Sequence, residues 1–151
     1  MWPLIMSLAL YQQEILALAA AGEKPKPLEN ADISMRVDNP LCGDRITISV
    51  TLSDGHVTGI GHKVQGCALC QAATALIANE VIGATAQEIE TANAQLTQFI
   101  ADEDDDVPLS WPKMSVFAPV RDFKNRLECL KLPFTALLRA LSTAKDKVTP
   151  Q

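Results

Sequence analysis

The stretch NPLCGDRITISVTLSDGHVTGIGHKVQGCALC, residues 39–70, contains the pattern that decides the fold. Between its outer cysteines, apolar residues alternate with polar ones at the two-residue period of a half-buried strand: Ile46, Ile48, Val50 and Leu52. Asp54 and Gly55 follow, and both residue types accept the positive φ of a tight two-residue turn. The stretch therefore predicts an antiparallel β-hairpin with its turn at residues 54–55.

The predicted turn also determines which residues lie opposite each other. The expected cross-strand pairs are Ser53 with His56, Arg45 with Val64, and Cys42 with Cys67. Gly59 and Gly61 are residues that accommodate a β-bulge, which would shift this register by one residue. In either register the hairpin brings Cys42 and Cys67 together at its open end, with Asp44 close by.

Length and composition describe an ordinary globular protein. The 151 residues are enough for one self-sufficient domain, expected to span residues 1–151. Apolar residues make up 48% of the chain and charged residues 21%, as is usual for such a domain. The net charge of −5 argues against nucleic acid as a partner, since phosphate binding needs a basic face. No apolar run reaches the roughly 18 residues of a membrane span, so we expect no membrane partner.

The N-terminal segment is apolar but does not resemble a signal peptide. It lacks a basic region at its start, and Gln12, Gln13 and Glu14 interrupt it, so we expect it to be part of the mature fold. Without a secretion signal, the expected compartment is the cytoplasm. Cysteines in that reducing environment more often bind metals or take part in catalysis than form disulfides.

Apolar spacing predicts helices on both sides of the hairpin. The expected elements are helix 3–21, an extended linker at 23–29, a strand at 31–37, the hairpin, helix 67–82, a helix with the stripe Ile89, Ala92, Leu96, Phe99 and Ile100, a helix marked by Val120, Phe123, Leu127 and Leu130, and a helix marked by Phe134, Leu137, Leu138 and Leu141. The fold class is therefore α+β, a small antiparallel β-sheet covered by helices.

Local signals set the expected ends of these helices. Gly22 and Gly83 should end the first two, and Thr85 with Glu88 forms a capping box for the third. The acidic run Asp102–Asp106 is expected to be a solvated loop. Prolines keep the next stretch irregular to residue 116, and Pro133 is expected in the first turn of the last helix.

Three cysteines and one aspartate form a candidate metal site. Cys42 and Asp44 precede a strand, and Cys67 opens a helix, where unpaired N–H groups favour a thiolate. Cys129 follows 62 residues later. Three thiolates and a carboxylate would complete a tetrahedral zinc site. The alternative is that these cysteines are ordinary small core residues.

Cys70 and the two histidines are not expected to bind metal. Cys67 and Cys70 form a CxxC pair, but no second pair follows and no strand-helix-strand pattern surrounds it. We expect Cys70 to be a core residue, with a spare-ligand or disulfide role under oxidation as the alternative. His56 and His62 are expected on the surface or on a face of the sheet.

At this point the motifs resemble those of the U-type iron–sulfur cluster assembly proteins, the family that includes IscU, SufU and the N-terminal domain of NifU. The matching segments are NPLCGDRI at 39–46, Gly66-Cys67 before a small-residue helix, and RLECLKLPF at 126–134. The similarity runs from Tyr11 to Leu141. Arg126 and the long interval before the last cysteine, which holds Glu103–Phe117, resemble the SufU branch in particular.

The resemblance implies a metal set, an acceptor and partners. Cys42, Asp44, Cys67 and Cys129 match the family's metal-ligand positions, and Cys42 matches its sulfur acceptor. The implied cofactor is zinc, and the implied sulfur donor is a cysteine desulfurase of the SufS type. Arg126 could stabilise the Cys42 thiolate or persulfide by its charge; a surface ion pair with Asp122 is an equally open alternative.

Three functions follow from these expectations. The first is a zinc-dependent sulfurtransferase that accepts persulfide sulfur and relays it to downstream cluster-assembly proteins. The second is a scaffold on which a [2Fe–2S] cluster is assembled and transferred, since thiolates hold such clusters and their iron. The third is a structural zinc module that only binds partner proteins.

Overall fold

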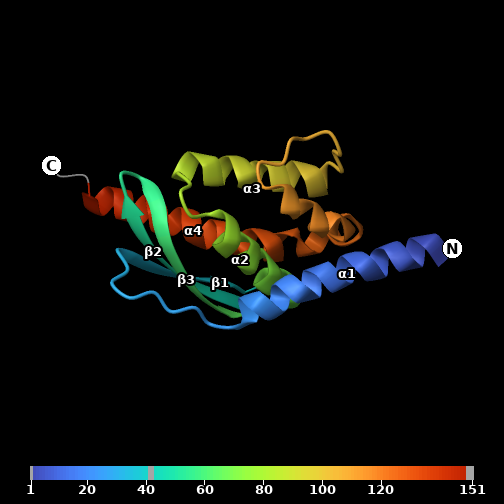
Figure 1. The fold of residues 1–151 in the computed structure, drawn as a ribbon, viewed down its shortest axis with the longest axis horizontal. Coiled ribbons are helices and arrows are strands. Elements are labelled where there is room, and N and C mark those ends of the chain that lie inside the picture. The colour runs from blue at the N-terminus through green and yellow to red at the C-terminus, as the bar shows by residue number, and fades with distance from the viewer. Residues whose placement is uncertain (1, 41–42, 149–151) are drawn as a thin grey trace.

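The computed structural model describes residues 2–40 and 43–148, with side chains described for 13–40 and 43–144. The elements are α1 (Trp2–Glu23), β1 (Ile33–Asn39), β2 (Asp44–Ser53), β3 (His56–Gln65), α2 (Ala68–Glu80), α3 (Ala86–Ala101), the 3-10 segment η1 (Pro112–Arg126) and α4 (Leu127–Val148). The strands form one antiparallel sheet in the order β1-β2-β3. The helices pack on this sheet and on one another (Figure 1), so the predicted α+β class is confirmed.

The hairpin has the predicted turn. Asp54 and Gly55 adopt φ of 51° and 78°, the positive values that a tight turn between twisted strands requires. Ser53 pairs with His56 as expected. The turn residues therefore set the hairpin from local chemistry alone.

A β-bulge then changes the register by one residue. Leu52 pairs with Val57 but Thr51 pairs with Gly59, which leaves Thr58 as an extra residue on β3. Beyond the bulge, Arg45 lies opposite Gln65 and not opposite Val64, so the unbroken register is wrong for this part of the hairpin. The expected pair of Cys42 with Cys67 lies outside the described residues.

One face of the sheet forms the floor of the core. Its buried side chains alternate along the strands: Ile33 and Val37 on β1, Ile46, Ile48 and Val50 on β2, and Ile60, His62 and Val64 on β3. Helix α4 packs against β1 and β2, while α1 and α2 pack against β3. Residues such as Ser34 and Lys63 lie on the opposite face and are exposed, as expected of a sheet with one solvated side.

Gly22 does not end the first helix, contrary to the prediction. The helix continues to Glu23, and a Cβ added at Gly22 would lie 1.9 Å from the carbonyl oxygen of Gln71 on α2. The glycine therefore allows two helix backbones to approach closely. Beyond this contact, the N-terminal half of α1 extends away from the other elements (Figure 1). No helix in the described part of the chain has the length and apolar character to cross a bilayer.

Helix α3 begins as the sequence predicts. Thr85 accepts a hydrogen bond from the Glu88 N–H at 3.2 Å, and the Glu88 carboxylate accepts one from the Thr85 N–H at 3.1 Å. This reciprocal pair satisfies N–H groups that have no partner within the helix. The predicted stripe is buried: Ile89, Ala92, Leu96, Phe99 and Ile100.

The predicted boundary between the last two helices is wrong. The segment from Pro112 to Arg126 is a 3-10 helix, and a single helix α4 then runs to Val148 with Pro133 in its interior. An interior proline costs about 3 kcal/mol, whereas each large apolar side chain buried along this helix contributes about 1.5–3 kcal/mol. Leu130, Phe134 and Leu137 are all fully buried, so tertiary packing outweighs the local signal of the proline.

Candidate metal centre

Asp44 is a buried carboxylate at the start of a strand. It is the first residue of β2, and its side chain lies on the same face as Ile46, toward the helices. Only 3% of it is exposed, so its charge needs partners within the protein. Cys67 supplies two: its N–H donates to Oδ1 at 3.0 Å and its thiol to Oδ2 at 3.4 Å.

Cys67 is the N-cap of helix α2. It has extended backbone angles, φ −72° and ψ 167°, and its own side chain makes no capping hydrogen bond. The Asp44 carboxylate therefore lies at the end of the helix where N–H groups point outward and the helix dipole favours negative charge. This arrangement connects the first strand of the hairpin to the start of the helix that follows it.

Gly66 makes this contact possible. A Cβ added there would lie 2.6 Å from Asp44 Oδ1 and 2.7 Å from its Cγ. From the sequence, Gly66 was noted only as the residue before Cys67 in a motif, and this role was missed. Its position directly before Cys67 was the available signal, since a glycine beside a ligand-type residue often marks a close approach.

Cys129 completes the cluster from the opposite end of the chain. It lies in the first turn of α4 and is 2% exposed. Its Sγ, the Cys67 Sγ and a carboxylate oxygen of Asp44 all lie within 4.8 Å of one another. Three elements that are distant in sequence therefore converge on one point at the edge of the core.

The donor set of this cluster suits a metal ion. Two sulfur atoms and one carboxylate oxygen are ligand types that zinc accepts, and their mutual separations are compatible with a shared ion. Two thiols are also the ligand type that holds iron–sulfur clusters. The fourth predicted ligand, Cys42, lies outside the described residues, and metal binding by the set stays a prediction.

Cys70 and the two histidines are not among the grouped ligand residues. Cys70 is fully buried within α2 as a core residue, in agreement with the prediction. His56 is exposed at the turn, and His62 is buried on the core face of the sheet. Burial, together with the charge of Lys26, lowers the pKa of His62 below its ordinary value. His62 is therefore a neutral core residue at neutral pH.

Arg126 lines a groove formed by α1, α2 and η1. The groove has a volume of about 420 Å³ and apolar walls from α1, α2 and η1: Ile15, Leu16, Leu69, Pro119, Val120 and Phe123. Arg126 is the charged residue of this lining, and it precedes Cys129 by three positions. Across the described residues no ion pair joins Arg126 to Asp122, so the alternative role for this arginine is absent from the structure.

Phe123 differs from its expected position in the core. Its backbone angles, φ −138° and ψ 57°, interrupt η1, and its side chain is 61% exposed. With Leu16, which is 58% exposed, it presents apolar surface along the groove. Exposed apolar surface of this kind is typical of a protein-binding face.

The family of the chain emerges from comparison with known proteins. A family model described as NifU-like N terminal domain matches residues 10–130. The chain is 24% identical over 132 residues to an iron–sulfur cluster assembly scaffold protein IscU from Thermotoga maritima, covering 87% of this chain and 92% of the relative. It is 25% identical over 139 residues to a zinc-dependent sulfurtransferase SufU from Bacillus subtilis, covering 88% and 90% respectively.

A solved structure has the same fold. The crystal structure of the N-terminal part of a nitrogen-fixing NifU-like protein from Brucella abortus superimposes with a TM-score of 0.80 and 32% sequence identity. The superposition covers 89% of this chain and 94% of that structure. The two proteins therefore share the fold over most of their lengths.

Proposed function

The chain belongs to the NifU-like N-terminal domain family of iron–sulfur cluster assembly proteins, and from this premise we propose that it is a zinc-dependent acceptor of persulfide sulfur. The donor would be a cysteine desulfurase of the SufS type, and the sulfur would pass on to downstream cluster-assembly proteins. A relative that is similar over 88% of this chain is named a zinc-dependent sulfurtransferase, which supports the proposal.

The observation that carries the proposal is the convergence of Asp44, Cys67 and Cys129 within 4.8 Å. With Cys42 two positions before Asp44, four ligand-type residues would surround one zinc ion. Bound zinc would supply positive charge that keeps the thiols ionised and held in place until a partner arrives. The partly buried hydrogen bonds between Asp44 and Cys67 would position two of these ligands in advance.

The proposed transfer is a thiol exchange without net oxidation. The Cys42 thiolate attacks the outer sulfur of the donor's persulfide, a new S–S bond forms on Cys42, and the donor's S–S bond breaks. The electron pair of the broken bond leaves with the donor cysteine, which departs as a thiolate. Cys42 is the proposed acceptor because it comes two positions before Asp44 in the sequence and is not part of a helix pattern, whereas Cys67 caps one helix and Cys129 lies within another.

Arg126 would assist by its charge. Arg126 lines the groove and ends the η1 segment that leads directly into α4 and Cys129. A cation there would stabilise the thiolate or persulfide of Cys42. The apolar walls of the groove would meanwhile exclude water around the approaching donor loop.

The test follows the transferred sulfur. The protein is incubated with the desulfurase and cysteine, alkylated, and digested, and mass spectrometry then locates the added sulfur. We expect sulfur on the peptide that contains Cys42, its loss in Cys42→Ser, and normal labelling in the core control Cys70→Ser. Labelling first on Cys67 or Cys129, with Cys42→Ser still stimulating the desulfurase, would refute the relay.

A scaffold for a [2Fe–2S] cluster is the second candidate. The Thermotoga maritima relative is named a scaffold, and two thiols beside a carboxylate are a donor set that such a cluster accepts. Metal analysis and an absorption spectrum of the protein as purified distinguish the two functions. One zinc ion in colourless protein supports the relay, whereas iron and sulfide in brown protein support the scaffold.

A further inference from the structure

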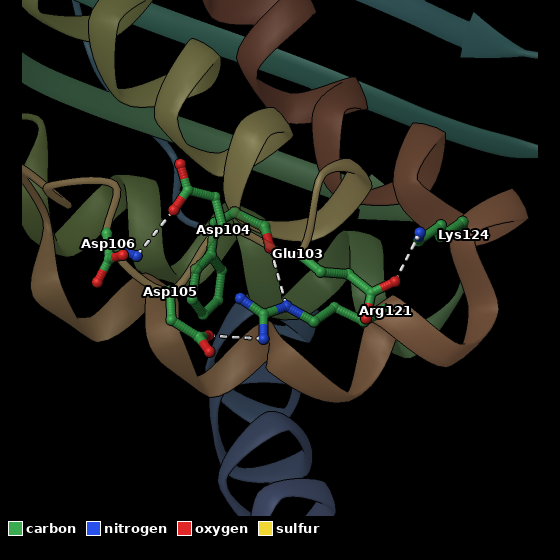
Figure 2. Close-up of polar contacts among 7 residues, drawn as sticks. Glu103, Asp104, Asp105, Asp106, Arg121 and Lys124 are labelled. Atoms are coloured by element: carbon green, nitrogen blue, oxygen red, sulfur yellow. Dashed lines mark hydrogen bonds and ion pairs between the residues drawn. The ribbon is translucent and has the colours of Figure 1, made fainter.

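The acidic run Asp102–Asp106 is more than the solvated loop that its composition predicts. Figure 2 shows two of its carboxylates reaching η1: Glu103 pairs with Lys124 at 2.9 Å and Asp105 with Arg121 at 2.7 Å. Within the loop, Asp104 accepts a hydrogen bond from the Asp106 N–H at 2.9 Å. The loop that ends α3 is therefore attached to the segment that leads into α4.

Arg121 is the centre of this attachment. Its side chain is only 17% exposed, and its guanidinium lies 4.2 Å from the centre of the Phe99 ring. Its Nε donates to the Phe99 carbonyl at 2.9 Å, one of the carbonyls in the last turn of α3 that have no partner within the helix. Arg121 thus contacts the end of α3, an aromatic face and the carboxylate of Asp105, which is itself 80% exposed.

Glu103 gives a second sign that the loop is built for this contact. It follows the C-cap of α3 with φ of 50°, a left-handed conformation that ordinarily favours glycine. The chain uses glutamate there, and the carboxylate pairs with Lys124, which lowers the pKa of Glu103 below its ordinary value. The side chain of this left-handed residue therefore has a partner on η1.

The two ion pairs lie on either side of the break in η1. Arg121 precedes Phe123, whose backbone is not helical, and Lys124 follows it. Two residues beyond Lys124 comes Arg126, and Cys129 follows in the first turn of α4. Because α4 begins directly after η1, contacts that fix the conformation of this break also fix the start of α4 and the position of the Cys129 sulfur.

We propose that Arg121 is a positioning residue of the metal centre, which through Asp105 and Phe99 holds the junction of η1 and α4 so that Cys129 stays aligned with Asp44 and Cys67. This inference rests on the proposed metal-binding function. Arg121 itself is not a ligand, and it acts through the backbone that connects it to Cys129. Lys124, which is 45% exposed against 17% for Arg121, supports the same junction more weakly through Glu103.

The experiment measures zinc release from the loaded protein. Each variant is loaded with zinc, and the rate of transfer to a chromogenic chelator is recorded beside the free energy of unfolding in urea. Arg121→Met keeps a long apolar stem but removes the charge and all the donors, and we expect zinc release to be about tenfold faster, as for loss of an outer-shell partner. Lys124→Met should change the rate by about twofold or less. Lys113→Met, which removes an exposed cation from the same segment, should leave it unchanged.

Two further variants separate positioning from general stability. Ile89→Val shortens a core side chain at the opposite end of α3 and should lower stability without changing the rate of zinc release. Arg121→Lys keeps the charge but not the fork of donors, and we expect release about threefold faster; this variant replaces Arg121→Met if that one does not fold.

The outcomes are distinguishable. The positioning role would be overturned if the Arg121 variant that folds released zinc at the wild-type rate. It would also be overturned if Ile89→Val accelerated zinc release as much as that variant does. If the wild type itself retains no zinc, the proposed function fails, and the inference fails with it. Cobalt-loaded Arg121→Met provides a second readout, since a displaced Cys129 thiolate should weaken the sulfur-to-cobalt absorption that Lys113→Met retains.

Discussion

Replacing Gly66 with alanine tests the centre with a single methyl group. The backbone at Gly66 does not have a positive φ, so alanine is tolerated there without conformational strain. The whole effect should therefore come from the contact with Asp44. The added Cβ would lie 2.6 Å from Oδ1, whereas an ordinary contact begins at 3.4 Å.

The expected magnitude follows from this geometry. The carboxylate must move by about 0.8 Å to restore an ordinary contact, which would break its 3.0 Å hydrogen bond with the Cys67 N–H. Loss of a buried hydrogen bond to a charged group costs about 1.5–3 kcal/mol of the free energy of unfolding. Displacement of a metal-centre carboxylate by this amount should weaken zinc affinity by about 10–100-fold.

The assay is a chelator competition for zinc together with urea unfolding, performed as a double-mutant cycle with Asp44→Ala. Once the carboxylate is removed, the contacts at 2.6 and 2.7 Å are gone and only the Asp44 Cβ remains, 3.0 Å from the added Cβ, so Gly66→Ala should cost clearly less than it does in the wild type. Wild-type zinc affinity in Gly66→Ala, or an undiminished effect in the Asp44→Ala background, would show that Gly66 does not shape the centre.

Three other predictions concern the core and the linkage of metal to fold. Gly22→Ala should destabilise the protein by about 3 kcal/mol or more in urea unfolding, because its Cβ would lie 1.9 Å from a backbone oxygen of α2; a loss below 1 kcal/mol would contradict the tight packing of α1 on α2. Burial lowers the pKa of His62 in the folded protein. As pH falls through 6.5, His62 therefore becomes protonated in the unfolded chain while it stays neutral in the folded protein, which favours unfolding. The stability advantage of wild type over His62→Gln, complete above that pH, should therefore shrink between pH 7.5 and pH 5.5; a constant difference would mean that His62 does not titrate differently on folding. Removal of zinc by chelation should lower the melting temperature by about 5–10 °C, relative to protein at a free zinc concentration about 100-fold above the Kd, because the ligands join distant elements. An unchanged melting curve would place the ion outside the cooperative core.

Local sequence chemistry predicted most of the elements. Asp54-Gly55 specified the turn, alternating residues such as Ile46 and Ile48 specified the strand, and Thr85 with Glu88 specified the start of α3. These features depend on residues close in sequence, so they can be inferred without knowing what packs on them. The candidate ligands were also recognisable, because few residue types bind metal and motifs surround each one.

Other features depend on contacts between distant residues, and no local pattern reveals them. Pro133 predicted a helix start, yet the buried face of α4 continues through it. Gly22 predicted a helix end, yet it serves the close contact of α1 with α2. In both cases packing energy from elsewhere in the chain exceeded a local preference.

By itself, the sequence determined the α+β class, the hairpin and the identity of the residues that could bind metal, because turn chemistry, hydrophobic period and ligand type are properties of short segments. Only the tertiary structure decided that Asp44, Cys67 and Cys129 meet within 4.8 Å, that Gly66 makes room for the carboxylate, and that the acidic loop holds Arg121. The physical reason is that these arrangements depend on how α2, α3 and α4 pack around one sheet edge, which is a property of the whole core.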